Sequence, residues 1–100
     1  MINIRTFGSN PAEIRLNELL IEQQDEKVAH WVCATLAKFR QGIAALEPVE
    51  REWRQTFLAM LREKYLTLVE NRGLPEKIKT FLLNVITTDY RVALERLNHG

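Results

Sequence analysis

Three prolines divide this chain, and each stands where a helical pattern of apolar residues begins. They are Pro11, Pro48 and Pro75, and the 100-residue sequence contains no others. Proline is tolerated at the first position of a helix, because the N–H that it lacks would have no partner there and its fixed φ suits a helix. Only four glycines are present to interrupt these patterns. The sequence therefore predicts an all-α protein.

The first helix is predicted from its N-terminal residues. Asn10 precedes Pro11, and Glu13 follows at the third helical position. In this arrangement the Asn side chain caps the helix and the Glu side chain bonds back to the cap. Apolar residues at helical spacing continue from 14 to 21, so we expect a helix over 11–23.

A second helix is expected to follow after a short break. Asp25 is a suitable N-cap, and apolar residues three or four positions apart run from Val28 to Leu46. The alternative is one continuous helix over 11–46, which would be much longer than the usual ~11–12 residues. We therefore predict that the chain breaks at 24–25.

Pro48 is predicted to open a third helix and Pro75 a fourth, which runs to the C-terminus. The third helix should end at Gly73, in the left-handed conformation that is typical of helix C-termini. The β-branched residues at 85–88 are weaker helix formers, so a kink or a new cap there is an alternative. The predicted fold is a small bundle of about four helices, or three if the first two merge.

Residues 1–10 are predicted to form a short extended N-terminal arm, outside a single helical domain at 11–100. Ile2 and Ile4 alternate with polar residues, as they would in a strand. One short strand is not stable without a partner. The arm is therefore expected to fray, to lie over the bundle through Phe7, or to pair with another protein chain.

Composition and charge exclude several classes of protein. Hydrophobic residues make up 46% of the chain and charged residues 27%, which is ordinary for a globular domain. A formal net charge of +1 creates no strong field that would attract polyanions or membranes. The single cysteine suits a reducing compartment, and no apolar run approaches the ~20 residues that span a bilayer. We expect a cytoplasmic protein that does not bind membranes.

Few residues offer chemistry for catalysis or metal binding. Glu26 and His30, like Glu95 and His99, are four residues apart and share a helix face, but di-iron bundles use a three-residue step and additional glutamates. Cys33 lies beside an apolar seam and is expected to be a small buried hydrophobe. The sequence contains no phosphate-binding loop or hydrolase motif. We expect no enzyme activity, no metal and no cofactor.

The third helix has a wider apolar arc than a surface helix needs. On a helical wheel one stripe is interpreted as the packing face of the helix. A second seam, made by Leu58, Tyr65 and Val69, extends the apolar arc to about half of the helix. This seam belongs either to the core, if the helix is central, or to an interface. The apolar residues of the first stripe are Trp53, Phe57, Met60, Leu61 and Leu68.

These features favour a small non-enzymatic helical protein that binds a larger protein, as an adaptor, accessory subunit, chaperone or inhibitor. Apolar side chains on helix faces would supply the affinity, with aromatic residues, Trp53 among them, as anchors. The arm could add a strand to the partner's sheet. A homodimer would use the same surfaces. The residues predicted to contact a partner are Leu58, Tyr65, Val69, Trp31, Tyr90, Ile2 and Ile4.

The alternative function is association with nucleic acid, or modulation of a nucleic-acid-processing enzyme, through a diffuse basic patch in the C-terminal half. The segment EPVEREWR at 47–54 looks basic and aromatic. However, Glu47 and Glu50 each precede an arginine by four residues, a spacing at which they are expected to neutralise it. The cations left for nucleic acid or an acidic partner are Arg72, Lys77, Lys79, Arg91 and Arg96.

Overall fold

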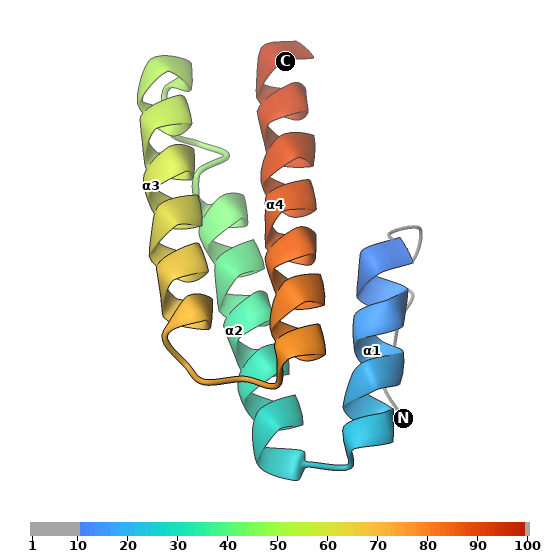
Figure 1. The fold of residues 1–100 in the computed structure, drawn as a ribbon. Helices are drawn as coiled ribbons and strands as arrows, with labels where there is room; N and C mark the ends of the chain where they lie inside the picture. Colours follow the sequence, from blue (N-terminus) through green and yellow to red (C-terminus); the bar gives the residue numbers. More distant parts are fainter. Residues whose placement is uncertain (1–10, 100) are drawn as a thin grey trace.

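Four α-helices make up most of the part of the chain that the computed structural model describes, residues 11–99 (Figure 1). No strand occurs within those residues, so the predicted all-α bundle of four helices is confirmed. The extended arm predicted at 1–10, including Ile2 and Ile4, lies outside the described residues. The helices are α1 (Pro11–Gln23), α2 (Glu26–Ala45), α3 (Arg51–Glu70) and α4 (Glu76–His99).

The predicted break between the first two helices is confirmed. Gln24 has a φ of 54°, which an α-helix cannot continue. Asp25 then caps α2, because its Oδ1 atom accepts hydrogen bonds from the backbone N–H groups of Lys27 (3.1 Å) and Val28 (3.2 Å). Two residues therefore separate α1 from α2, and the alternative of one continuous helix is wrong.

The connection between α2 and α3 differs from the prediction. Pro48 is predicted to open the third helix, but α3 begins three residues later, at Arg51. The N–H of Val49 donates to the carbonyl oxygen of Leu46 (3.0 Å), so Pro48 lies inside a tight turn. Pro48 occupies the third position of this turn, and its fixed φ does not decide whether the residues that follow continue as a helix.

The connection between α3 and α4 is closer to the prediction. Gly73 has a φ of 80°, the left-handed conformation expected for it. Pro75 immediately precedes α4, and its carbonyl oxygen accepts a hydrogen bond from the N–H of Lys79 (2.9 Å). Helix α4 continues without interruption through the β-branched residues at 85–88, because Val85 and Ile86 are fully buried in the core. Their burial outweighs a weak helix propensity.

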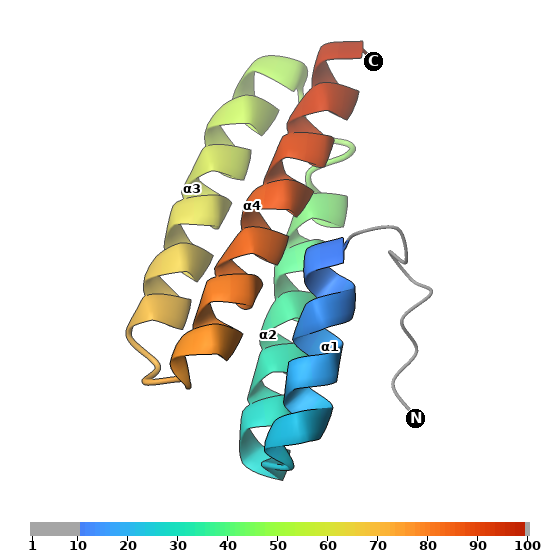
Figure 2. The same ribbon diagram turned by 45° about the vertical axis from the view of Figure 1, so that its right-hand side comes forward.

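Helix α4 lies at the centre of the bundle, between α1 on one side and α3 on the other (Figures 1 and 2). It contacts all three other helices, whereas no contact joins α1 to α3 anywhere in residues 11–99. Phe39 of α2 and Leu82 of α4 are fully buried at the middle of the core. No helix in this described part of the chain is both long and apolar enough to cross a bilayer.

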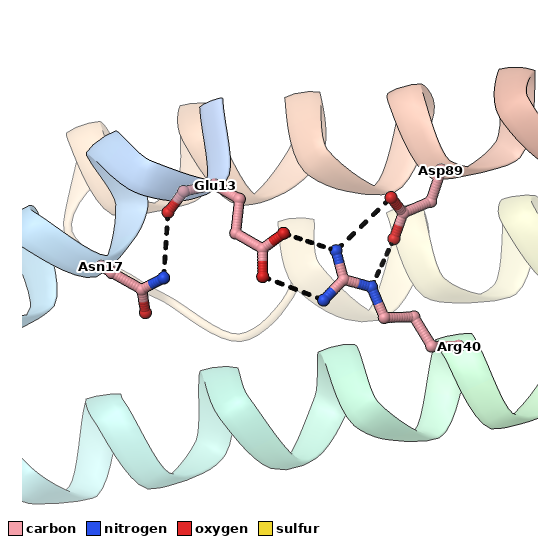
Figure 3. A network of polar contacts seen from close by, with 4 residues as sticks. All are labelled: Glu13, Asn17, Arg40 and Asp89. Atoms are coloured by element: carbon pink, nitrogen blue, oxygen red, sulfur yellow. Dashed lines mark hydrogen bonds and ion pairs between the residues drawn. The ribbon is translucent and has the colours of Figure 1, made fainter. Parts of the chain in front are cut away.

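A network of charged side chains joins three of the helices (Figure 3). The guanidinium of Arg40, on α2, donates two hydrogen bonds to the carboxylate of Glu13 on α1, at 3.0 and 2.9 Å. Its Nε atom donates to Asp89 on α4, at 2.7 Å. Asn17 completes the network by donating from Nδ2 to the carbonyl oxygen of Glu13 (3.2 Å). Sequence patterns indicate only a capping role for Glu13 and do not reveal its contact with Arg40.

Candidate protein-binding surface on helix α3

Helix α3 presents its first apolar stripe to solvent. Trp53 is 55% exposed and Met60 is 61% exposed, and Phe57 and Leu68 are exposed as well. Their spacings of four, three and eight residues place them on one side of the helix. We call these four residues the α3 apolar face. The prediction that this stripe is the packing face is wrong.

The second seam, predicted to be available to a partner, lies inside the bundle. Leu58 and Val69 are 2% and 0% exposed, and Tyr65 is also buried. The ring of Tyr65 packs edge-to-face on Phe39, with 5.4 Å between ring centroids. Of the two interpretations of this seam, the core interpretation is confirmed. The assignment of these three residues to a partner surface is wrong, because α2 and α4 already cover their side chains.

The α3 apolar face runs beside the contact between α3 and α2. Leu61, also expected in this stripe, packs toward Gly42 of α2, where an added Cβ would lie 2.9 Å from Leu61 Cδ2. Glycine therefore allows the two helices to approach closely at this point. On the face itself, the rings of Trp53 and Phe57 are stacked, with centroids 6.2 Å apart and planes 25° from parallel.

Lys64 lies within the same stripe and is exposed. It stands four residues after Met60 and four before Leu68, so it interrupts the α3 apolar face on the helix surface. Its Nζ atom is 5.6 Å from the ring centroid of Tyr65. A lysine in the middle of a stripe is a sign that the stripe meets water, since lysine is almost never fully buried unless paired. This signal could have corrected the prediction from sequence alone.

Trp31 and Tyr90 are half-buried, and an arginine lies over each ring. The guanidinium carbon of Arg72 is 5.3 Å from the ring centroid of Trp31, and that of Arg62 is 4.4 Å from the ring centroid of Tyr90. Cation–π contacts of this kind are worth roughly 0.5–1 kcal/mol at exposed sites. The two rings thus have contacts within the chain, and their contact with a partner stays a prediction.

The predicted basic patch is divided between two ends of the bundle. Arg72, Lys77 and Lys79 lie at or near the turn from α3 to α4, whereas Arg91 and Arg96 lie in the second half of α4. At 1.5 Å per residue, Lys77 and Arg96 are about 28 Å apart along the helix axis. Lys79 also forms an ion pair with Glu76, with 3.5 Å between Nζ of the lysine and Oε2 of the glutamate. The structure does not bring these five cations together.

The helical pairing expected in residues 47–54 depends on a helix that begins at Pro48. Since α3 begins at Arg51, Glu47 does not share a helical turn with that arginine. The Nε atom of Arg54 donates to the carbonyl oxygen of Val49 (3.1 Å), so this side chain is held against the turn that precedes α3. The segment is therefore a turn followed by the start of α3, and the side chain of Arg54 bonds to the backbone of that turn.

A groove of about 700 Å³ lies at the end of the bundle where α1 begins. Pro11 is at its edge, and Ile43, Leu58, Val92 and Leu97 contribute apolar lining from the other three helices. Helix α1 has 13 residues and α4 has 24, so α1 covers only part of its neighbours. Sequence patterns missed the groove because it results from unequal helix lengths rather than from any motif.

Among the side chains that the structure describes, those of residues 11–97, no group of three His, Cys, Asp or Glu residues is placed to hold a metal ion. Cys33, expected to be buried, is exposed, because the neighbouring Val32 and Leu36 take the core positions of α2. Comparison of the chain with protein families, with curated proteins and with solved structures finds no match.

Proposed function

We propose that this chain is a small non-enzymatic protein that binds another protein through the α3 apolar face, as an adaptor, accessory subunit, chaperone or inhibitor. One observation carries the proposal: four large apolar side chains are exposed in one stripe of a helix whose other side already packs in the core. Burying apolar surface is favourable by roughly 25 cal/mol per Å². A stripe that the described part of the fold leaves exposed is thus a candidate surface for a partner.

The residue types on this face suit protein recognition. Trp is among the residues that most often dominate binding energy at interfaces, and Met adapts its shape to a partner. Stacking between Trp53 and Phe57 reduces the freedom that these rings would lose on binding. The exposed thiol of Cys33 fits a reducing compartment, so the proposed setting is the cytoplasm.

The alternative function, association with nucleic acid, has less support. Phosphate binding gains from several cations that act on one stretch of backbone. Arg72, Lys77 and Lys79 are separated from Arg91 and Arg96 along the length of α4. Within the described residues, these five cations do not lie along one continuous groove.

Affinity capture from cell lysate, with quantitative mass spectrometry, tests the proposal. The wild-type chain is compared with Trp53→Ser/Met60→Ser, which removes two apolar side chains from the α3 apolar face. Ile21→Ser is the matched control, because Ile21 is 63% exposed and Met60 is 61% exposed, but Ile21 lies on α1. We expect a protein that is retained by the wild type and by Ile21→Ser and lost with the double variant.

Two readouts complete this experiment. All three proteins should have the same helical content by circular dichroism, since exposed substitutions change stability little. If the captured proteins are the same for the wild type and the double variant, the α3 apolar face does not bind them and the proposal is wrong.

A further inference from the structure

A row of glutamates borders the α3 apolar face along one edge. Glu52, Glu63 and Glu70 are all exposed, and Glu63 Oε1 accepts a hydrogen bond from the guanidinium of Arg62 at 3.1 Å, so part of its charge is balanced within the chain. They are eleven and seven residues apart, about three and two helical turns, so they lie on one line along the helix. Glu63 stands three residues after Met60, which places this acidic edge directly beside the apolar stripe. The opposite border of the face is the contact with α2 at Leu61.

The face therefore has three chemical parts, and each constrains a partner. The apolar stripe requires apolar side chains opposite it. The acidic edge favours cations along one side only, because like charges that meet at an interface cost binding free energy. Lys64, in the middle of the stripe, would lose hydration on binding unless the partner places an acceptor against it.

We propose that the α3 apolar face binds an amphipathic helix of another protein, one that carries basic residues along the edge facing Glu52, Glu63 and Glu70 and an acidic residue opposite Lys64. This inference rests on the proposed function and names the partner's chemistry. The stripe from Trp53 to Leu68 is about 22 Å long at 1.5 Å per residue. The matching helix has about four turns, and the Lys64 contact fixes its register, as a polar residue does in a coiled coil.

A second copy of this chain fits the same face poorly. In an antiparallel pair related by a two-fold axis, equivalent edges lie side by side, so Glu52 of one copy would approach Glu70 of the other. In a parallel pair, Lys64 of each copy would meet Lys64 of the other inside the apolar stripe. Both arrangements place like charges together. An anionic membrane surface is disfavoured for the same reason, since it attracts basic rather than acidic amphipathic helices.

Stapled helical peptides of about four turns test the inference directly. Each carries a leucine stripe interrupted by one central glutamate. One peptide has lysines along a single edge, and the other has glutamates at those positions. Binding to the full chain is followed by fluorescence anisotropy at low and at high salt. We expect the lysine-edge peptide to bind at least about tenfold more tightly at low salt, with the ratio falling toward one near ~1 M salt, where charges more than ~3 Å apart are screened.

Variants of the chain assign the effect to residues. In Glu52→Gln/Glu63→Gln/Glu70→Gln the difference between the two peptides should disappear. The matched control is Glu22→Gln/Glu26→Gln/Glu47→Gln, which also removes three exposed glutamates, all from outside α3, and should leave the difference unchanged. Replacing the central glutamate of the peptide by leucine should weaken binding to the wild type, and Lys64→Leu should reverse that preference.

The outcomes separate the inference from the proposed function. If both peptides bind equally well and Trp53→Ser/Met60→Ser abolishes that binding, the charge inference is wrong, but the proposal that the α3 apolar face binds a protein stands. Binding that this double variant does not weaken would overturn the proposed function itself. Stable dimers of the chain in light scattering that dissociate in Met60→Ser, or binding to anionic vesicles, would identify a different occupant of the face and overturn the inference.

Discussion

Removing the guanidinium of Arg40 should destabilise this protein more than any other single change of a charged residue in the Glu13–Arg40–Asp89 network. The side chain of Arg40 is 15% exposed, that of Glu13 is 9% exposed and that of Asp89 is 11% exposed. Arg40→Met keeps the length of the side chain and its apolar stem but leaves two carboxylates close together without their cation (Figure 3). The change therefore isolates the charge of Arg40 from its packing.

The expected loss is set by the burial of the network. Breaking a buried ion pair by removing one partner typically costs about 3–5 kcal/mol, because the remaining charge is left uncompensated. Arg40 binds two carboxylates, so the loss should lie toward the upper end of that range. A domain of this size has a free energy of unfolding of roughly 5–15 kcal/mol. The loss is therefore a large fraction of the total stability, and the midpoint of urea unfolding should shift to a much lower concentration.

The pH dependence of the loss distinguishes charge from packing. Burial raises the pKa of Asp89 above its ordinary value of 3.8, and Arg40 opposes that rise. A carboxyl whose folded-state pKa is raised binds its proton more readily in the folded chain, so ionised Asp89 costs stability above that pKa, and the cost falls as the pH is lowered through it. Without Arg40 the pKa of Asp89 should rise further. The difference between wild type and Arg40→Met should therefore shrink from pH 7 toward pH 5.

Chemical unfolding at several pH values, followed by circular dichroism, measures this difference. The triple variant Arg40→Met/Glu13→Gln/Asp89→Asn is the control, since it has no charge left to be uncompensated and should recover much of the lost stability. The contrary result is that Arg40→Met lowers the free energy of unfolding equally at pH 7 and pH 5, with no recovery in the triple variant. That result would show that the network acts through packing, and it would refute the electrostatic argument.

Three further changes test the backbone and the core by the same unfolding measurement. Gln24→Gly should stabilise the chain by up to about 1 kcal/mol, because Gln24 has a φ of 54° and glycine adopts this conformation without strain; an unchanged midpoint would contradict this. Gly73→Ala should cost about 1 kcal/mol for the same reason in reverse, since its φ is 80°. Tyr65→Ala should cost about 3–5 kcal/mol as a core truncation, whereas Met60→Ala should stay within about 0.5 kcal/mol; equal losses would mean that both stripes of α3 pack.

Helix boundaries could be predicted wherever one residue forces the backbone to change direction. Asp25 caps α2 with its own carboxylate, and Gly73 adopts the left-handed conformation, so each signal acts within three residues. Pro48 shows the limit of such signals. The ring of proline fixes its own φ but not the conformation of the next residues, and the hydrogen bond from Val49 to Leu46 forms a turn there instead of a helix start.

The side on which α3 packs could not be predicted from its apolar pattern. Both stripes have helical spacing, and both contain aromatic residues, so the helical wheel is consistent with either one in the core. Whether the stripe of Trp53 or the seam of Tyr65 is buried depends on where α2 and α4 lie. The positions of these helices are set by contacts between residues far apart in the sequence. Phe39, 26 positions away in sequence from Tyr65, provides the contact that selects the second seam. Only Lys64, within the first stripe, carries this information locally.

The position of α1, like the packing side of α3, is fixed by contacts between residues far apart in the sequence. Glu13 and Asp89 are 27 and 49 residues from Arg40, and nothing in the sequence marks them as partners. Their network attaches α1 to α2 and α4, on the side of α4 away from α3 (Figure 1). In a four-helix bundle each helix packs on neighbours at its two sides, and two helices on a diagonal do not meet. Here α1 and α3 are the diagonal pair, since within the described residues each contacts α2 and α4 and neither contacts the other. Helix α3 therefore turns Tyr65 toward α2 and α4, and the opposite side of the helix, with Trp53 and Met60, remains in solvent.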